Sequence, residues 1–229
     1  MLLHVPLLIA AVVAAPPKEA GPRTNGVIML DGVETNVHWD DGDTFFAPSS
    51  GVKARLVGYN TLESYGAVHR FGPGEVALFQ IASDATALAT SRSWTCTTES
   101  GEGGYGRKSV DCPGLRGALL EAGLAHAFSV QGPAPKDDLD AQARGIEAKA
   151  GMWAQGAPKG LVTSVHSLDE KPGATSTYNR VLNVETGEAS KRPHANPHKP
   201  CEWVCAEGSC LLYVPYKQRY GDGKAQCLQ

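Results

Sequence analysis

The sequence predicts an α+β protein in which about three helices pack on a small five-stranded β-barrel, with a small disulfide-rich β region following. Three observations lead to this prediction. Short runs that favour strands alternate with turn signals in the first quarter of the chain, helical stretches follow, and the composition changes after Gly156. With 229 residues, 42% of them hydrophobic, the chain can bury one core and a small second unit. We expect the barrel domain to span residues 26–157 and the second region residues 158–229.

The first strands form a meander of hairpins. Asp-Gly and Ser-Ser-Gly sequences separate the runs and are typical of tight turns. The runs are Val27–Leu30, Thr35–His38, Thr44–Ala47 and Val52–Val57.

A core-facing helix is predicted from Pro73 to about Ser91, because Leu78, Ile81, Ala85 and Leu88 share one stripe. A second hairpin follows around the glycine-rich residues 101–106, with arms at 93–98 and 108–112. Two more helices are expected. One spans about 115–125, and the other starts at Asp137-Asp138 and places Leu139, Ala143, Ile146, Ala150 and Trp153 on one face.

Beyond Gly156 the sequence predicts strands at 161–167, 177–184 and 211–214, separated by polar segments that include residues 191–200. Four cysteines lie in the last thirty residues. A segment this short has little core of its own, so covalent cross-links are expected.

The first fifteen residues form an apolar run that ends in small residues, typical of a secretory signal peptide. Residues 16–25 are a Pro/Gly/Lys linker. The run is shorter than the roughly 20 apolar residues that span a bilayer, so we expect export to the cell envelope, the periplasm or the medium. An uncleaved membrane tether is the alternative, and no other stretch is suited to crossing a membrane.

Six cysteines in an exported chain indicate disulfides. Cys96 and Cys112 lie on the two arms of the second hairpin, where a cross-hairpin disulfide competes with two buried thiols. In the tail, His194 and His198 precede the cysteines at spacings that could hold zinc. Because structural zinc is commoner in reduced compartments, we expect two disulfides instead, in a connectivity that the sequence leaves open, among Cys201, Cys205, Cys210 and Cys227.

The charge distribution argues against tight non-specific nucleic-acid binding by the barrel. Residues 26–156 hold ten Lys or Arg against sixteen Asp or Glu, a net charge of −6, whereas residues 157–229 have a net charge of +2. Nucleic-acid affinity normally comes from a basic face that displaces counterions. Any such affinity must come from a local patch.

Asp41-Gly42-Asp43-Thr44 is the first candidate site segment. Carboxylates are the ligands that a hard cation such as calcium selects. Alone, such a sequence is more often a surface turn, and an EF-hand is excluded because no Glu occupies the twelfth loop position. Two further segments strengthen the case: Arg55 with Glu63 eight residues later, and Tyr105-Gly106-Arg107 after the helix.

In order and spacing, these segments resemble the staphylococcal nuclease (thermonuclease) family over residues 27–153. The resemblance implies a five-stranded OB-fold barrel, which the strand and helix order also predicts. It implies calcium bound by Asp43, Asn60 and the Thr61 carbonyl. It implies Glu63 as the base that activates water, Arg55 and Arg107 as a phosphate clamp, and Tyr105 as a phosphate contact.

This chain departs from the family pattern at several positions. Asn60 stands where the family has a metal-binding Asp, and this loss of one charge is expected to weaken calcium binding by about 10- to 100-fold. Leu62 stands in place of a proline. A lysine next to the tyrosine becomes Gly104, and a base-stacking tyrosine falls on Ser129. These changes reduce the expected grip on substrate.

Three functional hypotheses follow. The first is a secreted, monomeric, calcium-dependent endonuclease that hydrolyses phosphodiester bonds in single-stranded DNA or RNA and has no stable membrane partner. The second is a nucleic-acid-binding module that has lost turnover at Asn60. The third is a structural or interaction protein in which the disulfide-rich tail is functional and the barrel is a scaffold.

Overall fold

The computed structural model describes residues 24–71, 78–102 and 106–229. The predicted signal peptide, most of the predicted linker, Pro73 and Tyr105 lie outside the described residues, so the predictions made for them stay predictions.

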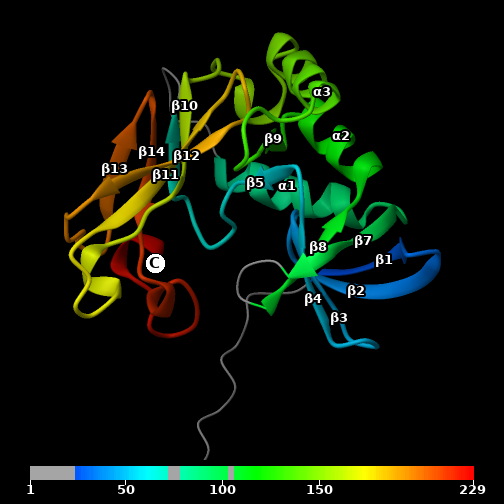
Figure 1. The fold of residues 1–229 in the computed structure, drawn as a ribbon, viewed down its shortest axis with the longest axis horizontal. Helices are drawn as coiled ribbons and strands as arrows, with labels where there is room; N and C mark the ends of the chain where they lie inside the picture. The colour runs from blue at the N-terminus through cyan, green and yellow to red at the C-terminus, as the bar shows by residue number, and fades with distance from the viewer. Residues whose placement is uncertain (1–23, 72–77, 103–105) are drawn as a thin grey trace, which may run out of the picture.

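The first half of the chain forms a closed six-stranded barrel of mixed parallel and antiparallel strands (Figure 1). Four strands follow one another as antiparallel hairpins, and two parallel pairs, β1 with β7 and β4 with β8, close the barrel. In spatial order the strands are β1 (Thr24–Leu30), β2 (Val33–Asp41), β3 (Thr44–Ala47), β4 (Val52–Leu56), β8 (Lys108–Asp111) and β7 (Thr95–Glu102).

The predicted meander and second hairpin are therefore present, but the barrel has six strands and not five. The sixth arises because both arms of the β7–β8 hairpin join the barrel wall, one beside β1 and the other beside β4. The Trp39 side chain lies at the centre of the barrel core. It is fully buried, with its ring 5.3 Å from that of Phe45.

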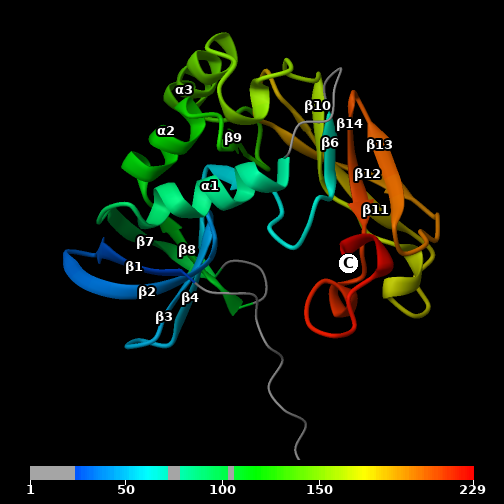
Figure 2. The same ribbon diagram turned by 180° about the vertical axis from the view of Figure 1, so that it is seen from behind.

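Three helices accompany the barrel: α1 (Leu78–Thr90), α2 (Pro113–Glu121) and α3 (Lys136–Glu147). Figure 2 shows α1 lying across the barrel, with α2 and α3 beyond it. The α1 stripe is largely as predicted, since Leu78, Ile81 and Ala85 are buried. Proline at the first position of α2 begins that helix two residues before the predicted start.

The predicted face of α3 is partly right, since Leu139 and Ile146 are partly buried and pack against the core. Its buried positions are Asp138, Ala141, Gln142 and Gly145, whereas Ala143 is exposed. Polar contacts accompany the buried positions. Asp138 accepts a hydrogen bond from Arg116, and Gln142 accepts from the Ala127 N–H and donates to the Val184 carbonyl. A side chain at Gly145 would meet the Leu120 carbonyl oxygen at 2.7 Å, so α3 can approach α2 only with glycine there.

The remaining strands form three smaller sheets. One holds β10 (Gly160–Ser164), β11 (Thr177–Asn183) and β12 (Ala189–His194), in that order. Another holds β13 (Glu202–Ala206), β14 (Ser209–Tyr213) and β6 (His69–Phe71), and the two-stranded sheet pairs β5 (Tyr59–Thr61) with β9 (Ala125–Ala127). Short 3-10 helices are η2 (Gly151–Trp153), η3 (Leu168–Glu170), η4 (Tyr216–Gln218) and η5 (Gln226–Leu228).

The sequence missed β12, because its residues are polar and include Pro193. β12 is an edge strand, where proline is tolerated and polar side chains can face water on both sides.

The C-terminal region is joined to the barrel half by strand pairing. β6 follows the Glu63 segment in sequence but pairs with β14, about 140 residues later. A bridge between Ser129 and Glu188, with the Ala189 N–H donating to the Ser129 carbonyl, makes a second link. The conformation of the residues around Glu63 thus depends on the end of the chain.

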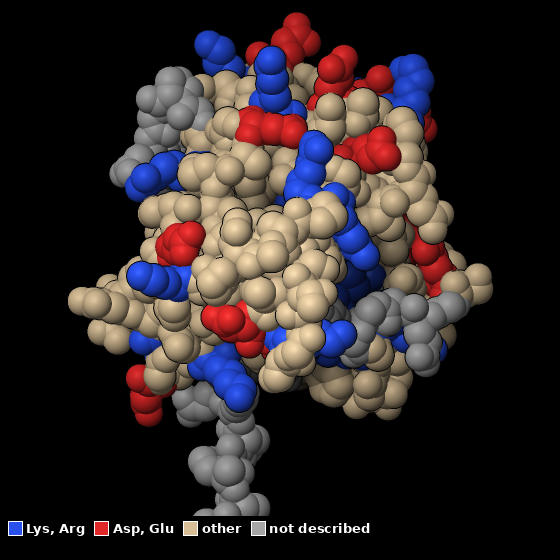
Figure 3. Space-filling view, turned by 60° about the vertical axis from the view of Figure 1, so that its left-hand side comes forward, with Lys and Arg blue, Asp and Glu red and all other residues tan. Residues whose placement is uncertain are grey.

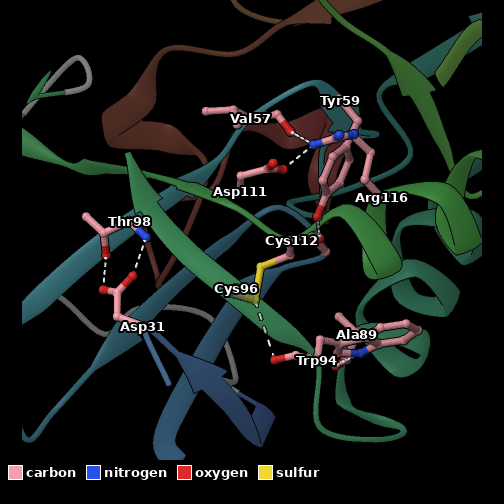
Figure 4. The surroundings of a disulfide bond; sticks show 11 residues. Asp31, Val57, Tyr59, Ala89, Trp94, Cys96, Thr98, Asp111, Cys112 and Arg116 are labelled. Carbon is pink, nitrogen blue, oxygen red and sulfur yellow. Dashed lines mark hydrogen bonds and ion pairs between the residues drawn. A yellow bond between two sulfur atoms is a disulfide. The ribbon is translucent and has the colours of Figure 1, made fainter. Parts of the chain in front are cut away.

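All six cysteines form disulfides: Cys96–Cys112, Cys201–Cys227 and Cys205–Cys210. The first is the expected cross-hairpin bond, and Figure 4 shows it to the right of the Asp31–Thr98 hydrogen bonds that tie β7 to the β1–β2 turn. The four tail cysteines hold two disulfides, so they are not available to bind zinc.

The disulfides indicate that this protein folds in an oxidising compartment. Within the described ranges, no helix combines the length and apolar character needed to cross a membrane.

We expect replacement of both Cys96 and Cys112 by Ala to lower the free energy of unfolding by about 3 kcal/mol, because the bond closes a loop with a sequence separation of 16. The matched control is the pair Cys205 and Cys210, separated by five residues, whose removal should cost about 1 kcal/mol less. Urea unfolding of both variants measures the difference. Equal losses would contradict the loop-size explanation.

Because His126 is buried, the free energy of unfolding of this protein should fall in acid. Burial lowers the pKa of His126 from 6.5 to about 4. Between pH 6.5 and pH 4, His126 is therefore protonated in the unfolded chain but stays neutral in the folded protein. The stabilisation present above pH 6.5 is lost as the pH falls toward 4, at up to about 1.4 kcal/mol per pH unit.

The matched variant is His126→Asn, whose amide can still donate to the Ala127 carbonyl that His126 Nδ1 contacts at 3.2 Å. Denaturant unfolding between pH 7 and pH 4.5 should show a shallower decline for this variant. Parallel curves would mean that His126 does not resist protonation.

Candidate functional site

The Asp41-Gly42-Asp43 segment is a buried turn between β2 and β3, not the surface turn that such sequences usually form. Asp43 is only 1% exposed. A side chain on Gly42 would lie 2.7 Å from Thr61 Cγ2 and 2.9 Å from the Cβ of Ala85 in α1, so glycine allows the turn to fit beneath the helix. The Tyr59 hydroxyl donates to the Gly42 carbonyl at 2.8 Å and holds the turn against β5.

Both carboxylate oxygens of Asp43 are fully engaged by protein donors. Oδ1 accepts from the Thr44 hydroxyl at 3.0 Å and from Arg55 Nη1. Oδ2 accepts from the Thr61 N–H at 2.9 Å and the Thr61 hydroxyl at 3.1 Å. A carboxylate offers about four lone-pair positions, and here all four are occupied.

Arg55 on β4 occupies the place between the candidate metal ligands. Its Nη1 bonds Asp43, and its Nη2 donates to the Asn60 side-chain oxygen at 2.5 Å. The strand register brings this about, since Arg55 is paired with Thr44 across the β3–β4 ladder. Asn60, Asp43 and Arg55 therefore form one connected group.

The charges of the group are balanced within the protein. Burial would raise the pKa of Asp43, but the Arg55 charge and the hydrogen bonds from Asp41, Thr61 and Thr44 outweigh it and lower the pKa. Burial and the neighbouring Asp43 charge instead raise the pKa of Asp41 well above its usual range. Asp43 is the ionised member of the acid pair, and Arg55 is its counterion.

A calcium ion would have to displace hydrogen-bond donors from this arrangement. It needs six to eight oxygen ligands, yet the Asp43 oxygens and the Asn60 oxygen already accept hydrogen bonds, two of them from a guanidinium that would repel the ion. In residues 24–71, 78–102 and 106–229, no group of three or more His, Cys, Asp or Glu side chains is placed to hold a metal.

Glu63 lies beside this group but contacts a different arginine. That arginine is Arg219, whose Nη1 is 3.8 Å from Glu63 Oε2. The backbone N–H of Glu63 donates to His69 Nε2 on β6 at 2.9 Å, so the imidazole is neutral, as its pKa of about 3 also requires. Burial raises the pKa of Glu63, with the Arg219 charge opposing the effect.

Arg107 immediately precedes β8, which pairs in parallel with β4 so that Ser109 lies opposite Arg55. The Arg107 backbone therefore lies at the beginning of the strand that is the neighbour of β4, which carries Arg55. Tyr105 lies outside the described residues, so its predicted phosphate contact stays a prediction.

Sequence reasoning missed Arg219. This residue follows η4, and its Nε donates to the Val214 carbonyl at 3.0 Å while its guanidinium lies 4.4 Å from the centre of the Tyr65 ring. Tyr220 and Leu228 hold the same segment against the chain after Glu63, through Tyr65 and Gly66. A lone arginine 156 positions after Glu63 carries no local signal that it would lie there.

Asp43→Asn is expected to lower the free energy of unfolding by about 3 kcal/mol, because it leaves the Arg55 guanidinium, with a side chain 28% exposed, without its counterion. The neighbouring Asp40→Asn is the matched control. Asp40 forms a more exposed pair with Lys53 at 3.9 Å and should lose less than about 1 kcal/mol. Thermal and urea unfolding would compare the two, and equal stability losses would show that Asp43 is not the centre of the group.

Comparison with known proteins adds no identity: no protein-family model matches this chain, and no curated protein matches it. What the site does must be argued from its geometry and from the motif order.

Proposed function

We propose that this chain is an exported OB-fold protein, similar to staphylococcal nuclease, that binds phosphodiester groups of single-stranded DNA or RNA without a metal. The observation that carries this proposal is the position of Arg55, whose guanidinium hydrogen-bonds both Asp43 and Asn60, two of the calcium ligands that the resemblance implies. The acid cluster is thus neutralised by the protein itself. This is the second of the hypotheses raised by the sequence.

Cationic groups support the binding role. Arg55 on β4, Arg107 at the start of β8 and Arg219 from the C-terminal segment come from three distant parts of the chain. Guanidinium groups match phosphate oxygens with two parallel hydrogen bonds. Because Arg55 is paired with Asp43 and Arg219 lies 3.8 Å from Glu63, a phosphate would have to compete with these two carboxylates.

A calcium-dependent nuclease is the second candidate, favoured by the grouping of Asp43, Arg55, Thr61 and Glu63 in the order that the thermonuclease resemblance implies. In that case Glu63, whose pKa is raised by burial, would be the base that activates water. Arg55 would first have to leave Asp43.

The test is a single-stranded oligonucleotide, labelled at one end, incubated with the protein in calcium or in chelator. We expect equal binding in both conditions, measured by fluorescence anisotropy, and no cleavage on a denaturing gel. Arg55→Lys keeps the charge but not the fork, and should weaken binding about 10-fold, because a charge-assisted hydrogen bond contributes roughly 1.5 kcal/mol or more. Lys136→Ala is the control, since it removes a cation whose side chain is 83% exposed on α3.

Cleavage that requires calcium would establish the nuclease instead. In that case Asn60→Asp, which restores the missing charge, should give unchanged or higher activity at low calcium. Absence of binding in both conditions would exclude both candidates and leave the interaction-protein hypothesis.

A further inference from the structure

Four side chains outside the candidate site form what we call the aromatic–basic strip: Phe128, Tyr178, Arg180 and Lys191. Arg180 on β11 and Lys191 on β12 are paired across the ladder, and Tyr178 lies on the same face as Arg180. Lys191 Nζ lies 4.7 Å from the centre of the Tyr178 ring. The Arg180 guanidinium carbon lies 5.7 Å from that ring and 5.9 Å from the ring of Phe128. Aromatic rings and cations thus alternate along one surface.

The strip is linked to the candidate site through β5 and β9. The Phe128 N–H donates to the Gly58 carbonyl at 2.9 Å, and His126, whose ring lies 6.3 Å from that of Phe128, is paired with Asn60 across β5 and β9. Asn60 in turn accepts from Arg55. Hydrogen bonds and strand pairing, with the buried His126 between them, therefore connect the Arg55 group to Phe128.

One N–H group of the Arg180 side chain lacks a hydrogen-bond partner in the described part of the chain. This group is the Nε–H, which is buried. Buried polar atoms are nearly always hydrogen-bonded, and a guanidinium N–H can be satisfied only by an acceptor. An anionic acceptor from outside the chain would satisfy it.

The surroundings favour a polyanion with flat groups. Residues 157–229 are net positive, whereas the barrel half is negative. Figure 3, which brings the C-terminal sheets forward, shows Lys and Arg side chains in an oblique row across this face. The His166 ring lies 5.0 Å from the Tyr178 ring, and its neighbouring acid Glu170 is paired with it at 3.2 Å. Single-stranded nucleic acid meets both demands, because its phosphates pair with cations and every base has a face that stacks on aromatic rings.

We propose that the aromatic–basic strip binds the continuation of a single-stranded nucleic acid beyond the candidate site, with bases against Tyr178 and Phe128 and phosphates at Arg180 and Lys191. This inference rests on the proposed function and extends it: it gives the C-terminal sheet a part in binding and makes affinity depend on strand length.

The experiment measures the affinity of the full-length protein for two oligothymidylates, one of about 4 nucleotides and one of about 16, by fluorescence anisotropy. The variants are Tyr178→Ala and Lys191→Ala. Phe128 is left intact because it packs against the core. Lys136→Ala is again the control, and thermal unfolding verifies that each variant is folded. Lys191→Glu provides a second substitution at this exposed position and reverses its charge.

We expect Tyr178→Ala to weaken binding of the long strand about 10-fold, with the short strand unaffected. Lys191→Ala should lower the slope of log affinity against log salt by about 0.7 for the long strand only. Lys191→Glu should weaken binding of the long strand further.

If the strip variants bind the long strand as tightly as the unaltered protein does, the proposed role of the strip is overturned. The proposed function still stands in that case, provided that Arg55→Lys weakens binding of the short strand. Equal competition by a sulfated polysaccharide, which lacks bases, would overturn the stacking role. No binding of either strand would overturn the strip and the proposed function together.

Discussion

The structure depends on one buried ionic interaction, the pairing of the Asp43 carboxylate with the Arg55 guanidinium. An ionised carboxylate that is 1% exposed can persist only if its lone pairs are satisfied, and Thr44, Thr61 and Arg55 satisfy them. These donors come from β3, β4 and β5. The interaction therefore fixes the positions of three strands relative to the turn under α1, and it decides which ligands the site can accept.

Much of the barrel could be predicted from the sequence. Alternating runs between Asp-Gly and Ser-Ser-Gly turns mark β1 to β4, and the symmetric placement of Cys96 and Cys112 about a glycine-rich turn marks the β7–β8 hairpin. Such signals are local, because they depend on neighbours within a few residues. The proximity of Asp43, Arg55 and Thr61 was likewise expected from the motif order.

What the sequence could not show depends on contacts between distant residues. The face of α3 also depends on Arg116 and on the backbone around Ala127. The hydrophobic spacing therefore identified Leu139 and Ile146 but misplaced Ala143. The sixth barrel strand depends on where the second hairpin closes. Arg219 reaches Glu63 only because β6 pairs with β14, and nothing near either residue indicates that pairing.

The shared sheet also changes how the two halves of the chain should be regarded. The predicted boundary at residue 157 coincides with a change in composition, but β6 belongs in space with the strands after residue 200. His69 on β6 holds the Glu63 backbone, and Arg219 holds its side chain. Function assigned to the barrel alone would leave out the residues that position one of its acids.

The β6–β14 pairing has a consequence for biosynthesis. A nascent chain emerges from the ribosome N-terminus first, and β6 must wait with an unpaired edge until residues 209–213 have been made. The surroundings of Glu63 thus mature last, after synthesis is nearly complete. A prematurely terminated polypeptide would carry the barrel strands, yet it would present an exposed, aggregation-prone strand edge where the finished molecule has a sheet.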